Sequence, residues 1–181
     1  MKLGFVSAIL DGWSFEEMID TARDLGFSCV EAACWPSGKA ERRYAGVSHI
    51  DVDGLTDEKA AYILGYCKER GVELSSLAFY PNTMDEDLEK RAANIAHLKK
   101  VILASEKLGV GMVTTFVGRA THKTVEENLE LFREIWPPIV AFADGTPRQG
   151  GHRELPHVVR RHQLARRPEP LHHPRHLAQV L

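Results

Sequence analysis

The chain has 181 residues, of which 44% are hydrophobic and 27% charged, and its formal net charge at pH 7 is −2. This composition is typical of a soluble globular protein with one sizeable core. No run approaches the about 20 apolar residues of a membrane span, and the start shows no small-residue cleavage site, so we expect a cytoplasmic protein without membrane contact.

Helices and strands alternate along the first 145 residues. Ser14 and Glu17 have the spacing of a capping box, and Thr56 or Asp57 can cap a second helix. Three helical patterns each end in a glycine suited to the left-handed position past a helix end. These glycines are Gly26, Gly71 and Gly109. The predicted order is strand 2–8, helix 14–25, strand 28–34, helix 57–70, strand 72–79, helix 86–108, strand 110–117 and helix 122–135.

The helix predicted for residues 86–108 has apolar residues at steps of three and four, as one buried face requires. We expect this stripe to belong to the core rather than to a cofactor site. Its members are Leu88, Ala92, Ile95, Leu98, Ile102 and Leu108.

Strict βα alternation predicts parallel strands, because parallel neighbours need crossover connections. The fold class is therefore α/β, either a doubly wound sheet or a partial (β/α)8 TIM barrel of about four βα units. No GxGxxG or GxxxxGK[ST] motif follows the first strand, which weighs against a nucleotide site. Residues 36–54 are typical of an elaborated βα loop that helps to build a barrel active site.

The composition changes near Gly145, so we divide the chain into residues 1–145 and 146–181. The first part has 16 Lys and Arg against 23 Asp and Glu, whereas the second has 7 against 2. The second part also holds six of the nine His and five of the nine Pro, with no Lys, Asp or aromatic residue. It lacks stacking residues and any nucleic-acid module, so we expect no nucleic-acid partner.

Histidines near the end of the chain raise the question of a metal site. His172, His173 and His176 lie among prolines that oppose a helix, so no single face holds them together. We therefore expect this tail to bind no metal.

The three cysteines form no paired CxxC spacing, which favours buried, reduced thiols over a disulfide or a zinc site. They are Cys29, Cys34 and Cys67.

Three segments together resemble the xylose isomerase-like TIM-barrel superfamily, in its sugar phosphate isomerase/epimerase branch. They read "MKLGFVSAILDGWSFEEMIDTARDLGFSCVEAACWP", "ERGVELSSLAFYPN" and "EKLGVGMVTTFVGR". The resemblance covers residues 1 to about 145. It implies a (β/α)8 enzyme of sugar or polyol substrates that uses a divalent metal (Mn, Mg, Co or Zn) and carboxylate bases to move a proton beside a carbonyl.

The resemblance also implies that the first metal ligand is a Glu at the end of strand five, in a segment such as "IEN". This sequence lacks that segment and continues "TPRQGGHRELPH" after "FADG". We therefore expect no bound metal, no catalytic residue and no isomerase activity in this chain.

A shift of reading frame explains the tail. Residues 152–157 can be encoded CAT CGA GAA CTG CCC CAT G, which one base later reads Ile-Glu-Asn-Cys-Pro-Met, a strand five with the family's Glu. The same offset turns residues 164–170 into Trp-Pro-Gly-Gly-Gln-Asn-Leu. A GC-rich gene read out of frame gains Arg, Pro and His, so we interpret residues 146–181 as out-of-frame and disordered.

In the barrel interpretation, residues at the carboxyl ends of the strands face the substrate. Glu31 then bonds a sugar or a neighbouring loop, or else forms a salt bridge. Trp35 forms an apolar wall against a sugar face, or else packs in its loop. His49 and His122 lie in loops, and we expect ordinary surface histidines there rather than metal ligands.

The third and fourth strands contribute further substrate-binding candidates. Tyr80 and Asn82 can hydrogen-bond hydroxyl groups, although "YPN" also suits a turn. Phe116 and Arg119 would line the site, with Arg119 meeting a phosphate or carboxylate; the alternative is a solvated arginine.

Two classes of function follow. The first is a sugar phosphate isomerase or epimerase lineage, truncated and inactive here; a polyol dehydratase is a variant of it, and a zinc endonuclease is disfavoured by the acidic charge of residues 1–145. The second is a non-catalytic ligand-binding or interaction fragment. Four βα units leave the first and fourth strands uncovered, so we also expect poor solubility or self-association.

Overall fold

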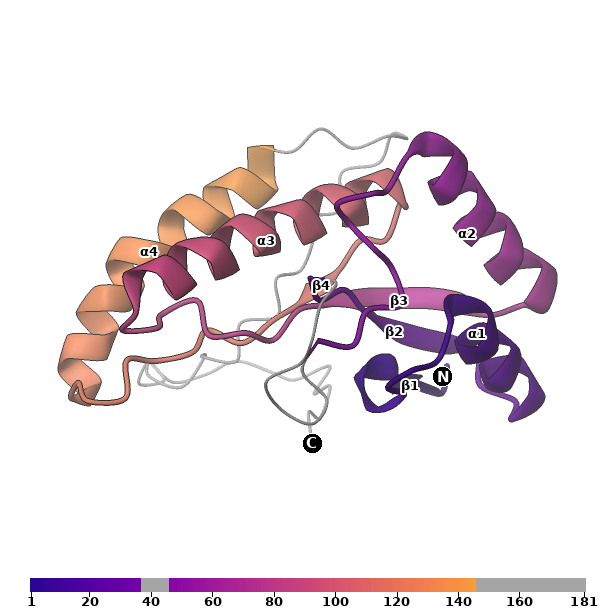
Figure 1. Ribbon diagram of the computed structural model, residues 1–181, viewed down its shortest axis with the longest axis horizontal. Helices are drawn as coiled ribbons and strands as arrows, with labels where there is room; N and C mark the ends of the chain where they lie inside the picture. Colours follow the sequence, from indigo (N-terminus) through magenta and orange to yellow (C-terminus); the bar gives the residue numbers. More distant parts are fainter. Residues whose placement is uncertain (37–45, 146–181) are drawn as a thin grey trace, which may run out of the picture.

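A computed structural model describes residues 1–36 and 46–145 (Figure 1). The tail and part of the loop after the second strand lie outside the described residues, so the tail interpretation stays a prediction. The elements are β1 (Gly4–Val6), the 3-10 helix η1 (Ser7–Ile9), α1 (Phe15–Asp24), β2 (Cys29–Ala33), α2 (Asp57–Arg70), β3 (Glu73–Ala78), α3 (Leu88–Lys107), β4 (Val113–Thr114) and α4 (Val125–Gly145). Among these residues, no helix is both long and apolar enough to cross a membrane.

The strands form one parallel sheet in the order β1-β2-β3-β4. The register sets Val6 beside Glu31, and Glu31 beside Ser76. Strand order follows chain order without the reversal that defines a doubly wound sheet. The sheet is therefore the partial TIM barrel predicted from the sequence, and the open-sheet alternative is set aside.

The predicted helix boundaries are largely confirmed by local hydrogen bonds. Ser14 and Glu17 form the reciprocal capping box at α1, and Thr56 rather than Asp57 caps α2 by accepting from the Lys59 amide. The three predicted glycines are all left-handed, with φ of 76°, 66° and 62° at positions 26, 71 and 109.

Three predicted elements have different lengths. Strand 2–8 contracts to β1 followed by η1, and strand 110–117 contracts to the two residues of β4, because each edge strand pairs on one side only. The helix predicted to end at 135 runs to Gly145 through Pro137 and Pro138. Proline removes a helical hydrogen bond, but buried Trp136 and Ile139 hold this part of α4 against the fold.

The predicted stripe on α3 is buried only in its second half. Leu98, Ile102 and Leu108 are in the core, whereas Leu88 and Ala92 are exposed. The first turn of α3 reaches past the end of the sheet, so its apolar residues have no strand beneath them (Figure 1).

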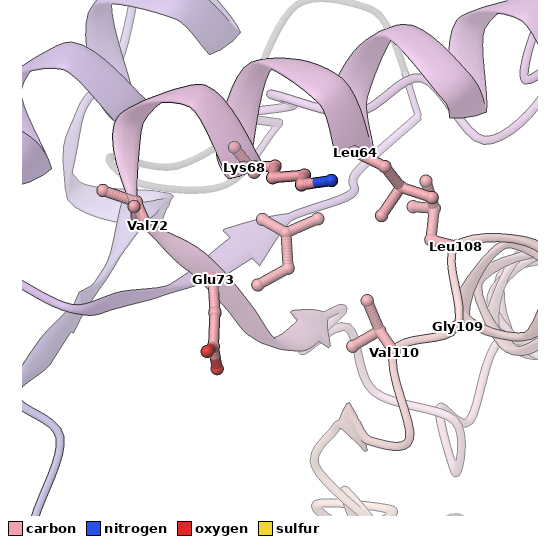
Figure 2. A pocket seen from close by; sticks show the side chains of 10 residues that line it. Leu64, Lys68, Val72, Glu73, Leu108, Gly109 and Val110 are labelled. Atoms are coloured by element: carbon pink, nitrogen blue, oxygen red, sulfur yellow. The ribbon is translucent and has the colours of Figure 1, made fainter.

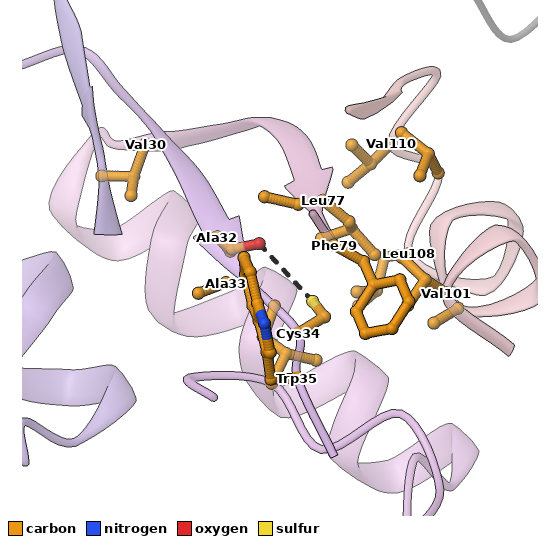
Figure 3. Close-up of a cluster of buried hydrophobic side chains, with 14 of the residues drawn as sticks. Val30, Ala32, Ala33, Cys34, Trp35, Leu77, Phe79, Val101, Leu108 and Val110 are labelled. Carbon is orange, nitrogen blue, oxygen red and sulfur yellow. Dashed lines mark hydrogen bonds between the residues drawn. The ribbon is translucent and has the colours of Figure 1, made fainter. Parts of the chain in front are cut away.

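Buried side chains fill the space between the sheet and the helices (Figure 3). Leu77 of β3 and Phe79, which directly follows β3, belong to this layer together with Val101 of α3. All three cysteines are free, and the predicted burial is confirmed for Cys34 and Cys67 but not for Cys29, which is half-buried. Burial raises the pKa of the Cys67 thiol to about 11.

Candidate functional site

Glu31 lies on β2 and is the one carboxylate of a polar cluster on the sheet. Its Oε2 accepts a hydrogen bond of 2.8 Å from the Ser76 hydroxyl, and its Oε1 accepts one from the Tyr80 hydroxyl. The side chain is half-buried. Thr114 on β4 extends the cluster, with its Oγ1 3.4 Å from the Tyr80 hydroxyl. We call Glu31, Ser76, Tyr80 and Thr114 the polar cluster.

Aromatic rings border the polar cluster. Tyr80 stacks on Phe116, with ring centroids 4.6 Å apart and an angle of 26° between the planes. Trp35 contacts Tyr80 edge-on, with ring centroids 5.5 Å apart. Phe116 remains 49% exposed, whereas Trp35 is only 7% exposed. The open aromatic surface is therefore that of Phe116 and Tyr80, and Trp35 packs in the core layer behind them.

Asn82 connects the loops that follow β3 and β4. Its Oδ1 accepts from the backbone amides of Met84 and Arg119, both at 3.0 Å, and its Nδ2 donates to the Arg119 carbonyl at 2.8 Å. Gly118 lies against this amide in a left-handed conformation, with φ of 77°. Both ends of the Asn82 amide are thus used in holding the loops, while the side chain of Arg119 is exposed.

His49 is buried, so the prediction of a surface histidine was wrong. Its Nδ1 lies 3.0 Å from Ser7 Oγ, and that oxygen accepts from the Ala33 amide. The loop after β2 folds back over the sheet, because the His49 amide also bonds the Ala33 carbonyl at 2.9 Å. Burial lowers the pKa of His49 below its usual value, and a Leu10 backbone group acts in the opposite direction.

His122 is exposed, as predicted. Its Nδ1 lies 2.7 Å from Glu86 Oε2, which joins the loop after β4 to the loop after β3.

Three hydroxyl residues of this region were not among the predicted site residues: Ser7, Ser76 and Thr114. A signal for the second was present, because "VELSSLAF" places serines inside an otherwise apolar parallel strand. The partner of each hydroxyl comes from another strand or loop, which only the sheet register reveals.

The described residues do not fit a divalent metal. Across residues 1–36 and 46–145, no three His, Cys, Asp or Glu side chains come together as ligands. The polar cluster holds one carboxylate, and both of its oxygens already accept hydroxyl protons. Divalent cations prefer several carboxylate or imidazole ligands, so no step can be derived through a metal here.

A pocket of about 460 Å³ lies at the amino ends of β3 and β4, opposite to the polar cluster (Figure 2). It is bordered by Leu64 and Lys68 of α2, Glu73 at the start of β3, and Leu108 and Val110 before β4. Barrel enzymes act at the carboxyl ends of their strands, so this pocket is not the candidate site.

The amino-acid sequence matches a family of known fold. The model of the family described as "Xylose isomerase-like TIM barrel" matches residues 19–146, which is more than half of the chain. The chain belongs to this family. The polar cluster and its aromatic border lie toward the carboxyl ends of β2, β3 and β4, the end of the strands at which TIM-barrel enzymes act.

Solved structures share the xylose isomerase-like fold. A xylose isomerase domain protein from Planctomyces limnophilus is 15% identical with a TM-score of 0.54, and the match covers 78% of this chain and 50% of that one. D-Psicose 3-epimerase with D-tagatose from Clostridium cellulolyticum H10 is 16% identical with a TM-score of 0.53, covering 79% and 48%. The IolI protein with a bound zinc atom is 15% identical with a TM-score of 0.55, covering 80% and 48%.

These identities show a common fold and no more. The chain spans about half the length of the solved structures that it matches. No curated protein matches the sequence.

Proposed function

We propose that this chain carries the sugar- or polyol-facing half of an isomerase or epimerase barrel and has no turnover of its own. The observation that carries the proposal is the Glu31 carboxylate, held by the Ser76 and Tyr80 hydroxyls beside the stacked Tyr80 and Phe116 rings. Membership of the xylose isomerase-like family supports this reaction class, as does D-psicose 3-epimerase among the structures with this fold.

The polar cluster has acceptor capacity left for a ligand. A carboxylate offers about four lone-pair sites, and hydroxyl protons from Ser76 and Tyr80 use two of them. A sugar hydroxyl can occupy a remaining site, with the hydrogen bond strengthened by the charge on Glu31. The two hydroxyl bonds also fix the orientation of the carboxylate before a ligand arrives.

The aromatic rings beside the polar cluster match the apolar face of a sugar ring. The C–H groups on one face of a sugar ring are apolar and pack on an aromatic face. Phe116 is half exposed and is held by its stacking on Tyr80, so this apolar surface adjoins the charged oxygens of Glu31. A ligand with both hydroxyl groups and an apolar face can use both.

Activity requires groups that the described residues do not supply. Proton transfer beside a carbonyl needs a base and a means to stabilise the enediolate charge. The resemblance puts these on the second half of the barrel, together with the metal. We therefore propose that the chain binds its ligand weakly and does not turn it over.

Ligand binding is tested with the full chain by following its tryptophan fluorescence and its amide NMR shifts during titration with D-fructose and D-tagatose. We expect millimolar binding, with the largest shifts near Tyr80 and Phe116. Glu31→Gln keeps the shape of the side chain and should weaken binding about tenfold, since the charged acceptor is lost. Glu16→Gln removes a half-buried carboxylate of α1 that accepts from the Tyr62 hydroxyl, outside the polar cluster, and should leave binding unchanged.

Turnover is tested separately, by incubating the chain with the same sugars and with Mn²⁺, Mg²⁺, Co²⁺ or Zn²⁺. We expect no epimerised product and no sub-micromolar Mn²⁺ site by calorimetry. Metal-stimulated turnover would show that the chain is a complete enzyme. Absence of sugar binding, or equal binding by Glu31→Gln, would instead favour an interaction fragment without a sugar site.

A further inference from the structure

The free edge of β1 is lined by exposed apolar side chains. Leu3 is 63% exposed and Ile9 is 58% exposed, and Val6 and Trp13 are also exposed large hydrophobic residues. All four belong to β1 or to the segments that directly flank it. Within the described residues β1 has β2 as its only strand partner, so its backbone groups on the other side are unpaired by any strand.

The opposite edge of the sheet has the same character. β4 pairs with β3 alone in the described part of the chain, and Phe116 follows it with half of its surface exposed. The helix that follows, α4, packs on α3, and Val125 and Leu129 of α4 are exposed (Figure 1). Both edges therefore end in unpaired backbone and apolar side chains, which is the arrangement that recruits another strand.

We propose that two copies of this chain close a single eight-stranded barrel around a two-fold axis. The four strands are parallel. A half-turn about an axis along the strands therefore brings β4 of a second copy beside β1 of the first in parallel orientation, and makes the same contact on the other side. Four strands from each copy make the eight that close a (β/α)8 barrel.

A second copy is the partner that fits best, because it pairs the free edges of β1 and β4 at the same time. One rotation pairs the free edge of β1 with that of β4 in two identical contacts, which leaves no strand edge open. A single added strand would cover one edge and expose a new one.

Electrostatic repulsion does not prevent this association. Residues 1–145 carry 16 Lys and Arg against 23 Asp and Glu, and the tail brings the formal charge of the whole chain to −2; at physiological salt, exposed charges more than about 8 Å apart are largely screened. The proposal rests on the sheet edges alone and does not require the polar cluster to bind a sugar.

The experiment measures the mass of the full chain by light scattering and sedimentation over a range of concentrations. We expect a discrete species of twice the 20.3 kDa chain mass. Leu3→Lys with Ile9→Lys puts charges at the free edge of β1 and should weaken the dimer at least about tenfold. Leu64→Lys with Leu103→Lys changes two exposed leucines that lie on α2 and α3 rather than on an edge strand, and should leave the dimer intact.

Cross-linking distinguishes the closed barrel from other dimers. Ile9→Cys and Phe116→Cys lie beyond the carboxyl ends of β1 and β4, so a mixture of the two variants should give a disulfide-linked heterodimer on oxidation. Neither variant alone should link, because the two β1 edges lie on opposite sides of the barrel. The wild-type chain controls for its own cysteines.

A monomer at all concentrations, an open series of larger species, or a dimer that survives Leu3→Lys with Ile9→Lys would overturn the proposal. So would linking of Ile9→Cys to itself. Circular dichroism of each variant confirms that it is folded before its mass is interpreted.

Discussion

Tyr80 donates a hydrogen bond to Glu31 across two neighbouring strands, although the two residues are 49 positions apart in the chain. The register of β2 on β3 makes this contact, since it sets Glu31 beside Ser76 and brings the residues after β3 to the same end of the sheet. The carboxylate is oriented from two sides by neutral hydroxyl groups. It therefore keeps its charge available to a ligand rather than to a salt bridge.

Removing the Tyr80 hydroxyl should have a measurable cost. Tyr80→Phe keeps the stacking on Phe116 but leaves Glu31 with one hydroxyl donor, so we expect the free energy of unfolding to fall by about 1 kcal/mol. Urea denaturation measures this change. Tyr62→Phe loses a hydrogen bond to Glu16 that is exposed to solvent, and its effect should be smaller, about 0.5 kcal/mol or less. Equal effects of the two variants would mean that the Glu31 bond has no special role.

The loop pair held by Asn82 predicts an effect at Gly118. An added Cβ there would lie 1.8 Å from Asn82 Oδ1, so Gly118→Ala must break the contact between the loops. Gly12 has a similar φ of 80° and nothing within 4 Å of an added Cβ, so Gly12→Ala carries only the left-handed backbone cost of about 1 kcal/mol. We expect Gly118→Ala to be the more destabilising by at least about 1 kcal/mol in thermal or urea unfolding. The same loss in both would contradict the role given to Asn82.

Burial of His49 predicts a dependence of stability on pH. Because the pKa of His49 is lower in the folded chain than in the unfolded one, the unfolded state takes up the proton first as the pH falls. The contribution of neutral His49 to the free energy of unfolding is fully present above about pH 6.5, the ordinary pKa of histidine. It is lost as the pH falls through the pKa of His49 in the folded chain. Urea midpoints between pH 7.5 and 5.5 should therefore decline, and His49→Gln should flatten the decline. An unchanged slope in the variant would assign the effect to other groups.

Differences in burial among the cysteines predict their reactivity. Burial raises the pKa of Cys67 to about 11 and also raises that of Cys34, so few thiolates form at pH 8 and access is restricted. Cys29 is half-buried. Iodoacetamide at pH 8 should modify Cys29 before the other two, as read by peptide mass spectrometry, whereas all three should react in denaturant. Fast labelling of Cys34 in the native chain would argue against its place in the core layer of Figure 3.

The origin of residues 146–181 is a prediction about the gene. Sequencing around codons 140–155 should show that the bases of codons 152–157, read one base later, encode Ile-Glu-Asn-Cys-Pro-Met. Restoring that frame should give a longer chain with a Glu at the end of strand five, and with it metal-dependent activity. An early stop in the shifted frame, or a different peptide, would end the frameshift interpretation.

The amino-acid sequence alone determined the order and type of the helices and strands. Local patterns were enough, since Ser14 with Glu17 and the left-handed glycines 26 and 71 mark helix ends through contacts within a few residues. Element lengths were harder to predict. Within the described part of the chain β4 pairs with β3 alone and is short, and α4 continues through Pro137 because Trp136 is buried. Both depend on contacts distant in sequence.

Tertiary structure decided what each candidate residue does. The sequence predicted Glu31, Tyr80 and Asn82 as site residues from their positions at the ends of strands. Whether such a side chain bonds a ligand or a neighbouring loop depends on which groups the fold places around it. The parallel register brings Tyr80 to Glu31, while the loop geometry turns the Asn82 amide onto Arg119. The prediction for His49 was wrong for the same reason, since its burial comes from contacts with η1 and β2 that no local pattern contains.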